Sequence, residues 1–239
     1  MRYNNSVIES QSSTKRLLLV GGSSSLGKSI MKLALEAGYE ITQTSRDISL
    51  FPSTRNCTSI QLDLGSKESI DAFLEQLSDQ KFSRIIFLAG KLTERHLPNI
   101  SHGFLADYYG KFVTGMLYVM QEIKINLAAD GNILALSSRA ANHPSYDFHY
   151  SAAKGALQAF VMSFSKFMDR NQSIVAIAPS LIENTSMYRY MSQENVDRHR
   201  VRAGNYLLEL DGVASFIWNL TPSLTKFANG RTLEIGNDY

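Results

Sequence analysis

Short apolar runs alternate along the chain with longer stretches in which apolar residues recur at helical spacing. An apolar run of four to eight residues predicts a strand buried on both faces, whereas apolar residues three and four apart predict a helix. The runs lie at 15–20, 39–44, 57–62, 84–90, 132–138, 173–179 and 231–235. The helical stretches lie at about 26–37, 66–79, 104–128, 150–169 and 211–220.

Strand and helix follow one another almost to the end of the chain. Because parallel strands need a crossover connection, this order predicts an α/β fold: a single Rossmann-like, doubly wound parallel β-sheet flanked by helices on both faces. We place this domain at 15–239 and a polar N-terminal arm without an apolar signal-peptide core at 1–14. Ligands of such sheets bind outside the carboxyl ends of the strands.

Composition narrows the class of protein. The chain has 239 residues, of which 44% are hydrophobic, enough for one sizeable core. Its 24 basic and 22 acidic residues leave a formal net charge of +2, which gives no electrostatic reason to expect nucleic acid or a membrane surface as a partner. Cys57 is the only cysteine, so we expect no disulfide and a reducing, cytoplasmic location. The histidine spacing predicts no metal site.

The segment VGGSSSLGKS at 20–29 has two interpretations. Its serines suggest a linker, but it lies between the first strand and first helix of one βα unit. Glycines there permit a sharp turn and close approach to a phosphate, and the helix N-terminus offers N–H groups to the anion. Position therefore favours a phosphate-binding loop, although a turn without a ligand has equal weight on this motif alone.

The segment LLLVGGSSSLGKSI resembles the fingerprint Thr-Gly-x-x-x-Gly-x-Gly of the short-chain dehydrogenase/reductase family. Gly21 and Gly27 match its outer glycines, and Ser25 stands at the middle one. Tyr150 and Lys154 have the family's Tyr-x-x-x-Lys spacing, and Ser138 ends a strand twelve residues earlier, so all three match the catalytic triad. The resemblance spans about 15–236 and implies interconversion of a carbonyl and an alcohol.

The chemistry of the implied reaction explains these residue types. A carbonyl oxygen that gains a hydride at carbon needs a proton, which Tyr150 would give as acid/base. An unperturbed phenol has a pKa near 10, and the Lys154 ammonium is expected to lower it. Ser138 would hydrogen-bond the substrate oxygen.

The resemblance also implies a nicotinamide cofactor. Arg46, just after the second strand, suits a 2′-phosphate and favours NADP(H), with NAD(H) as the alternative. Asp63 would contact the adenine amino group. The implied cofactor-binding residues are Gly21, Ser23, Ser24, Ser25, Leu26, Gly27, Ser45, Arg46, Asp63, Leu64, Ala89, Gly90, Tyr150, Lys154, Pro179, Ile182 and Thr185.

Several positions depart from the family pattern. Val20 replaces its threonine, Leu88 one of its asparagines before Ala-Gly, and Phe112 the asparagine of the long fourth helix. These departures motivate an alternative: a catalytically weak or inactive member that binds nucleotide or a partner protein. The complete Ser-Tyr-Lys set argues against that alternative.

The expected substrate side is polar. In this family 183–206 would be the substrate lid, and it carries four arginines at 189, 198, 200 and 202. The segment 139–149 is polar as well. We therefore expect a small polar substrate, anionic or sugar-like, although a solvated loop explains most of these side chains equally well. The resemblance further implies a homodimer or homotetramer that packs through the helices at 104–128 and 150–169.

Overall fold

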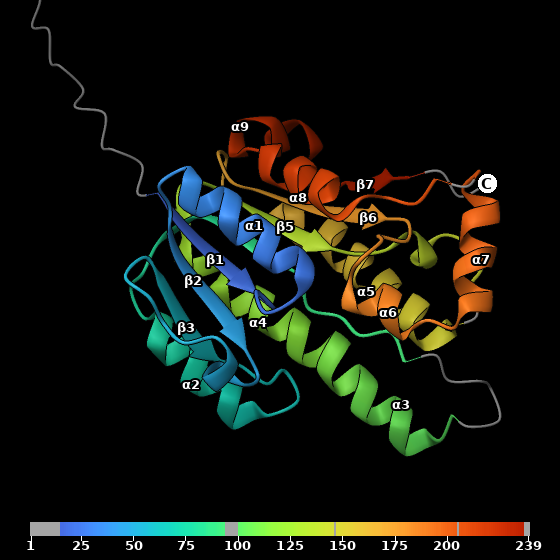
Figure 1. Ribbon diagram of the computed structural model, residues 1–239. Helices are drawn as coiled ribbons and strands as arrows, with labels where there is room; N and C mark the ends of the chain where they lie inside the picture. Colours follow the sequence, from blue (N-terminus) through green and yellow to red (C-terminus); the bar gives the residue numbers. More distant parts are fainter. Residues whose placement is uncertain (1–14, 94–99, 146, 205, 237–239) are drawn as a thin grey trace, which may run out of the picture.

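A single parallel sheet organises the computed structural model, which describes residues 15–93, 100–145, 147–204 and 206–236 (Figure 1). The strand order is β3-β2-β1-β4-β5-β6-β7, so the order reverses between β1 and β4. The predicted doubly wound fold is confirmed. The strands are β1 (Arg16–Val20), β2 (Glu40–Ser45), β3 (Cys57–Gln61), β4 (Phe82–Phe87), β5 (Leu127–Leu136), β6 (Ser173–Pro179) and β7 (Thr232–Ile235).

Helices cover both faces of the sheet and bury two separate apolar clusters. One cluster joins α2, α4 and α5 to the sheet, and the other joins α1 and α8 to the opposite face. In the described part of the chain, no helix has the length and hydropathy needed to cross a membrane. The helices are α1 (Ser25–Glu36), α2 (Lys67–Leu77), α3 (His102–Tyr109), α4 (Met116–Glu122), α5 (Phe148–Phe164), α6 (Ser186–Tyr190), α7 (Gln193–Arg202), α8 (Leu210–Asn219) and α9 (Pro222–Thr225).

The helix predicted at 104–128 is not continuous. A π-helical segment, Gly110–Gly115, separates α3 from α4, a 3-10 turn follows at Ile123–Asn126, and β5 begins at Leu127. A Cβ at Gly115 would collide with the carbonyl group of Leu64, so glycine lets this segment pack against the β3–α2 loop.

The second long helix also differs from its prediction. The helix α5 starts two residues early, at Phe148, and its α-helical part ends at Phe164. The region 183–206 contains α6 and α7, which apolar spacing did not reveal because their exposed sides are polar. The predicted arm at 1–14 lies outside the described residues.

A buried arginine joins the sheet to α8. Arg84 on β4 is 2% exposed, and its guanidinium donates to the carbonyl groups of Trp218 (2.6 Å), Ile217 (3.2 Å) and Leu220 (2.9 Å). It also lies 4.4 Å from the centre of the Trp218 ring. Burial lowers the pKa of Arg84 to about 10. The side chain thus satisfies the carbonyl groups that every helix leaves open at its C-terminal end.

Candidate active site

The loop between β1 and α1 has the geometry of a phosphate cradle. Ser24 caps α1, its Oγ accepting a hydrogen bond from the Gly27 N–H at 3.0 Å. Gly21 has a φ of +87°, in the region that favours glycine, and a Cβ at Gly27 would collide with the carbonyl group of Gly22. The tight turn therefore needs glycine at both positions, as the family fingerprint implies.

The start of α1 suits an anionic group. Ser24, Ser25 and Leu26 line a cavity, and α1 presents its N-terminal end there. In the described structure the Ser25 hydroxyl makes no hydrogen bond, so it remains able to donate to a ligand. This loop fits the pyrophosphate of a dinucleotide.

Three side chains predicted as catalytic come together between the carboxyl end of β5 and the start of α5. Ser138 and Tyr150 are joined by a side-chain hydrogen bond. The Lys154 Nζ lies 5.8 Å from the centre of the Tyr150 ring and donates to the carbonyl groups of Leu136 (2.7 Å) and Ala89 (3.3 Å). Tyr150 is 7% exposed and Lys154 4%. Helical spacing explains why Tyr150 and Lys154 lie on the same face of α5.

Burial, rather than the ammonium group, dominates the ionisation of this pair. It raises the pKa of Tyr150 to about 12, against a smaller lowering by the Ser138 hydrogen bond. It also lowers the pKa of Lys154 to about 8. We expected Lys154 to lower the pKa of Tyr150, but its Nζ is directed at main-chain carbonyl groups instead. Tyr150 is consequently protonated at neutral pH and able to give a proton.

Residues at the ends of β2 and β3 lie apart from the catalytic group. The Asp63 carboxylate accepts a hydrogen bond from the Gly65 N–H (2.9 Å), which shapes the turn before α2. Ser45 Oγ donates to the carbonyl group of Asp47 (3.0 Å), and the Arg46 side chain is exposed just beyond β2. An exposed guanidinium and a carboxylate at these strand ends fit the adenosine half of a dinucleotide.

Glycine is also needed beside the lysine. A Cβ at Gly90 would lie 2.9 Å from the Lys154 Nζ, so the chain after β4 passes close to the Lys154 ammonium.

A cavity of about 220 Å³ opens in front of Ser138 and Tyr150. It is lined by nine of the predicted site residues: Ser24, Ser25, Leu26, Gly90, Ser138, Tyr150, Pro179, Ile182 and Thr185. The other predicted site residues do not line it: Gly21, Ser23, Gly27, Ser45, Arg46, Asp63, Leu64, Ala89 and Lys154. The cavity is thus lined by two of the three residues predicted as catalytic, and the residues predicted to hold the adenosine half lie outside it.

The walls of this cavity are mixed rather than polar throughout. Helix α6 contributes Met187, the residue after it is Met191, and α7 contributes Arg198, His199 and Arg202. Of the other polar residues expected here, some face elsewhere: Arg200, for example, pairs with Glu183, and His149 is fully buried beside Thr93.

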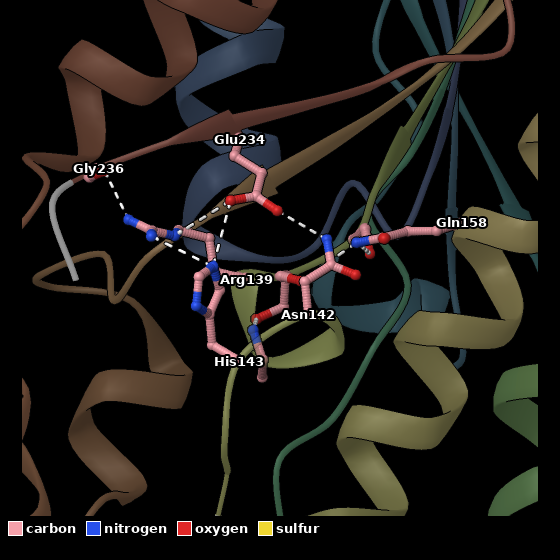
Figure 2. Close-up of polar contacts among 9 residues, drawn as sticks. Arg139, Asn142, His143, Gln158, Glu234 and Gly236 are labelled. Atoms are coloured by element: carbon pink, nitrogen blue, oxygen red, sulfur yellow. Dashed lines mark hydrogen bonds and ion pairs between the residues drawn. The ribbon is translucent and has the colours of Figure 1, made fainter. Parts of the chain in front are cut away.

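A polar network that the sequence did not reveal holds the segment after Ser138 (Figure 2). Arg139 Nη1 donates to the Gly236 carbonyl (2.6 Å), and Arg139 Nε lies 3.6 Å from Glu234 Oε2. Glu234 Oε1 accepts from Asn142 Nδ2 (2.7 Å), and Glu234 Oε2 lies 3.3 Å from His143 Nε2. These contacts, led by the Asn142 hydrogen bond, lower the pKa of Glu234. The network ties β7 to the segment that follows Ser138.

Gln158 is a further residue that the sequence analysis missed. Its Nε2 donates to Ser137 Oγ (3.0 Å) and to the carbonyl group of Ser138 (3.4 Å), which supports the end of β5. A signal existed, because Gln158 follows Lys154 by one helical turn and so lies on the same face of α5.

The departures from the family pattern have clear structural places. Leu88 is 7% exposed and packs in the apolar cluster beneath α1 and α8. Phe112 lies in the π-helical segment, with its ring centre 4.8 Å from that of Tyr108. Thr185 caps α6, accepting from the Tyr188 N–H (3.1 Å). In the described residues, no cluster of three or more His, Cys, Asp or Glu is arranged to hold a metal ion.

The fold and this site define a nucleotide-binding enzyme of the Rossmann type, and a family model agrees. The model of the short chain dehydrogenases matches residues 15–196. The chain belongs to the short-chain dehydrogenase family, a family of oxidoreductases. No curated protein matches it significantly.

Solved structures of the same family superimpose over nearly the whole chain. A short-chain dehydrogenase/reductase titled glucose/ribitol dehydrogenase from Brucella melitensis is 20% identical, covers 93% of this chain and 95% of its own, and has a TM-score of 0.82. A short chain dehydrogenase from Burkholderia cenocepacia, in complex with NADP, is 19% identical with the same TM-score, covering 93% and 96%. At these identities the likeness is one of fold.

Proposed function

We propose that the protein is an NADP(H)-dependent oxidoreductase that interconverts a carbonyl and an alcohol on a small substrate, with Tyr150 as the acid/base. The observation that carries this proposal is the proximity of Ser138, Tyr150 and Lys154: Ser138 and Tyr150 line the cavity and are joined by a hydrogen bond, and the Lys154 Nζ lies 5.8 Å from the centre of the Tyr150 ring. Together these three groups suit proton transfer to an oxygen atom.

The roles of the side chains follow from their geometry. A bound nicotinamide cofactor supplies the hydride in reduction and accepts it in oxidation. Tyr150 gives its proton to the carbonyl oxygen, and the hydroxyl of Ser138 donates a hydrogen bond that stabilises charge on the same oxygen. Lys154 places a positive charge next to the phenolate that forms, which offsets the cost of a buried anion.

The acid/base role is tested with Tyr150→Phe, in an NADPH oxidation assay over a panel of small aldehydes and ketones. We expect kcat to fall by about a thousandfold, because general acid catalysis contributes roughly 10²–10⁴. Tyr118→Phe on α4, where Tyr118 is 41% exposed, is the matched control and keeps full activity. Equal rates in wild type and Tyr150→Phe would reject the assigned acid.

NADP(H) is proposed over NAD(H) because Arg46 is exposed directly after β2. The last residue of that strand is Ser45 and not an acidic residue. Arg46→Gln should weaken NADPH binding by about tenfold or more and leave NADH binding unchanged, since only NADPH has the 2′-phosphate. Isothermal titration calorimetry measures both constants. Arg170→Gln, an exposed arginine on the turn before β6, is the control. Equal losses for the two cofactors would contradict the proposal.

A binding function without turnover is the second candidate, and Phe112 favours it. An aromatic ring there provides no hydrogen-bonding group for a proton relay to Lys154. Tight NADPH binding with no turnover on the whole panel would support this candidate. Turnover that Tyr150→Phe abolishes would exclude it.

Self-association is proposed through α4 and α5. Tyr118 (41% exposed), Met162 (62%) and Phe167 (66%), from these helices and the turn after α5, expose apolar surface that a second copy would cover. Light scattering should give the mass of a dimer or tetramer, and a monomer at micromolar concentration would refute the assembly.

A further inference from the structure

Helix α7 presents a basic face to the cavity. Asn195, Arg198, His199 and Arg202 all line it, and their spacing of three, four and seven residues places them on one side of the helix. Arg200 lies between them in sequence but is held elsewhere, with its Nη2 3.2 Å from both Glu183 Oε1 and the Tyr188 hydroxyl. The basic residues of α7 that line the cavity therefore all lie on one side of the helix.

Most positive groups at the cavity already have an acidic neighbour. Arg139 lies against Glu234 and donates to the carbonyl group of Gly236, as Figure 2 shows. Arg198 forms an ion pair with Glu194, one turn earlier on α7. Asp147 is the one carboxylate among the residues that line the cavity, and it adds negative charge near Tyr150 rather than on α7.

Arg202 differs from these arginines. Within the described ranges of the chain, its guanidinium makes no hydrogen bond and no ion pair. It lines the cavity at the last turn of α7, and the same wall contains the neutral or weakly basic groups Asn195 and His199. A guanidinium of this kind is a planar, permanently charged donor fork, which suits a carboxylate or a phosphate.

We propose that the substrate is an anionic carbonyl compound and that Arg202 binds its carboxylate or phosphate group. This inference rests on the proposed function, because it assigns the far end of the molecule whose carbonyl group faces Ser138 and Tyr150. The apolar residues Met187 and Met191 also line the cavity and would contact the carbon chain between the two ends. Recognition of the substrate's anionic group is thus assigned to α7, and proton transfer to its carbonyl oxygen is assigned to α5.

Matched substrate pairs test the charge requirement. The pairs are levulinate against methyl levulinate, and dihydroxyacetone phosphate against dihydroxyacetone. In the wild type, kcat/KM should favour the anionic member of at least one pair by about tenfold or more, as charge-assisted hydrogen bonds allow. Which pair shows the preference distinguishes a carboxylate from a phosphate. Equal kcat/KM within both pairs would overturn the inference.

Two variants of α7 locate the effect. Arg202→Gln should abolish the preference for the anionic member, mainly by raising the KM for that member. Arg200→Gln removes a positive charge from the same helix, at a residue that contacts Glu183 and Tyr188 and does not line the cavity. This variant should keep the preference for the anionic member. Retention of the preference in Arg202→Gln, or its loss in Arg200→Gln to the same extent, would contradict the assignment.

A binding measurement separates failure of this inference from failure of the proposed function. Calorimetric titration with levulinate and with dihydroxyacetone phosphate, in the presence of NADP, requires no turnover. Binding by the wild type that weakens about tenfold in Arg202→Gln supports the anion site even when no substrate is turned over. Wild-type protein that binds neither anion, while it reduces neutral carbonyl compounds, would overturn the anion site and leave the oxidoreductase intact.

Discussion

Two buried cations occupy opposite ends of the sheet and are held in similar ways. Arg84, near the start of β4, donates to three carbonyl groups at the end of α8. Lys154 donates to the carbonyl groups of Leu136 and Ala89, at the carboxyl ends of β5 and β4. Neither makes an ion pair with a carboxylate in the described part of the chain. Burial lowers the pKa of both.

The two sites differ in how well the charge is compensated. Arg84 has three carbonyl partners and the face of Trp218, and its pKa of about 10 keeps it charged at any physiological pH. Lys154 has two partners and a pKa of about 8, within reach of working conditions. The comparison teaches that Arg84 stabilises the fold, whereas Lys154 is buried at a cost in stability, which the proposed function would explain by the need for its charge in proton transfer.

The largest expected difference between the two cations concerns activity. Lys154→Met should lower kcat by about a thousandfold, because the phenolate of Tyr150 would lose its neighbouring positive charge. Arg84→Met should change kcat per folded molecule by less than about twofold, since its contacts lie at the other end of the sheet. Steady-state NADPH oxidation, corrected for the folded fraction by circular dichroism, measures both. Similar losses in the two variants would remove the distinction.

Stability should show the opposite order. Arg84→Met removes one donor from each of three carbonyl groups, and although Ile217 and Leu220 keep a second donor, we expect the free energy of unfolding to fall by about 3 kcal/mol. Arg84→Lys keeps the charge but not the planar fork, and about half of that loss should remain. Urea denaturation gives these values, with the exposed Arg170→Met as a control that changes stability by less than about 0.5 kcal/mol. A loss for Arg84→Met no larger than the control would contradict this role.

The pH dependence of stability isolates the cost of Lys154. Its pKa falls from 10.5 in the unfolded chain to about 8 in the folded protein, so between these values the unfolded state binds more protons. Stability should therefore rise with pH above 8, by about 3 kcal/mol near pH 10.5.

The burial of Tyr150 acts in the opposite direction at higher pH. Because its pKa rises to about 12, its contribution is present below pH 10 and is lost as the pH approaches 12. Denaturation of wild type and Lys154→Met between pH 7 and 10 measures the lysine alone. The rise should be absent from the variant, and identical pH profiles would show that Lys154 is not ionised differently on folding.

The sequence indicated the cation that we propose to be catalytic but not the structural one. Lys154 was predictable because its spacing from Tyr150 is a local property of one helix. Arg84 was not, since its partners lie at 217–220 and nothing in the strand itself indicates them. The ionic partner of Arg139 escaped for the same reason, as Glu234 belongs to the last strand.

Regular elements were predicted where apolar spacing alone determines them. All seven strands were found from their short apolar runs, including β3 and β7, whose residues are mostly half-buried or exposed. The π-helical segment at Gly110–Gly115 was missed because apolar spacing cannot register a wider turn within a longer helical stretch. Helices α6 and α7 were missed because so few of their residues are buried, Val196 alone among the described residues of the two.

The link between Arg139 and Glu234 has a consequence for mutational screens. Glu234 touches no reacting group, yet through Arg139 it helps hold the turn that follows Ser138. A screen for loss of activity would therefore return substitutions at Glu234 alongside those at Ser138. A survey that assigned function by distance along the chain would misread them as defects of folding.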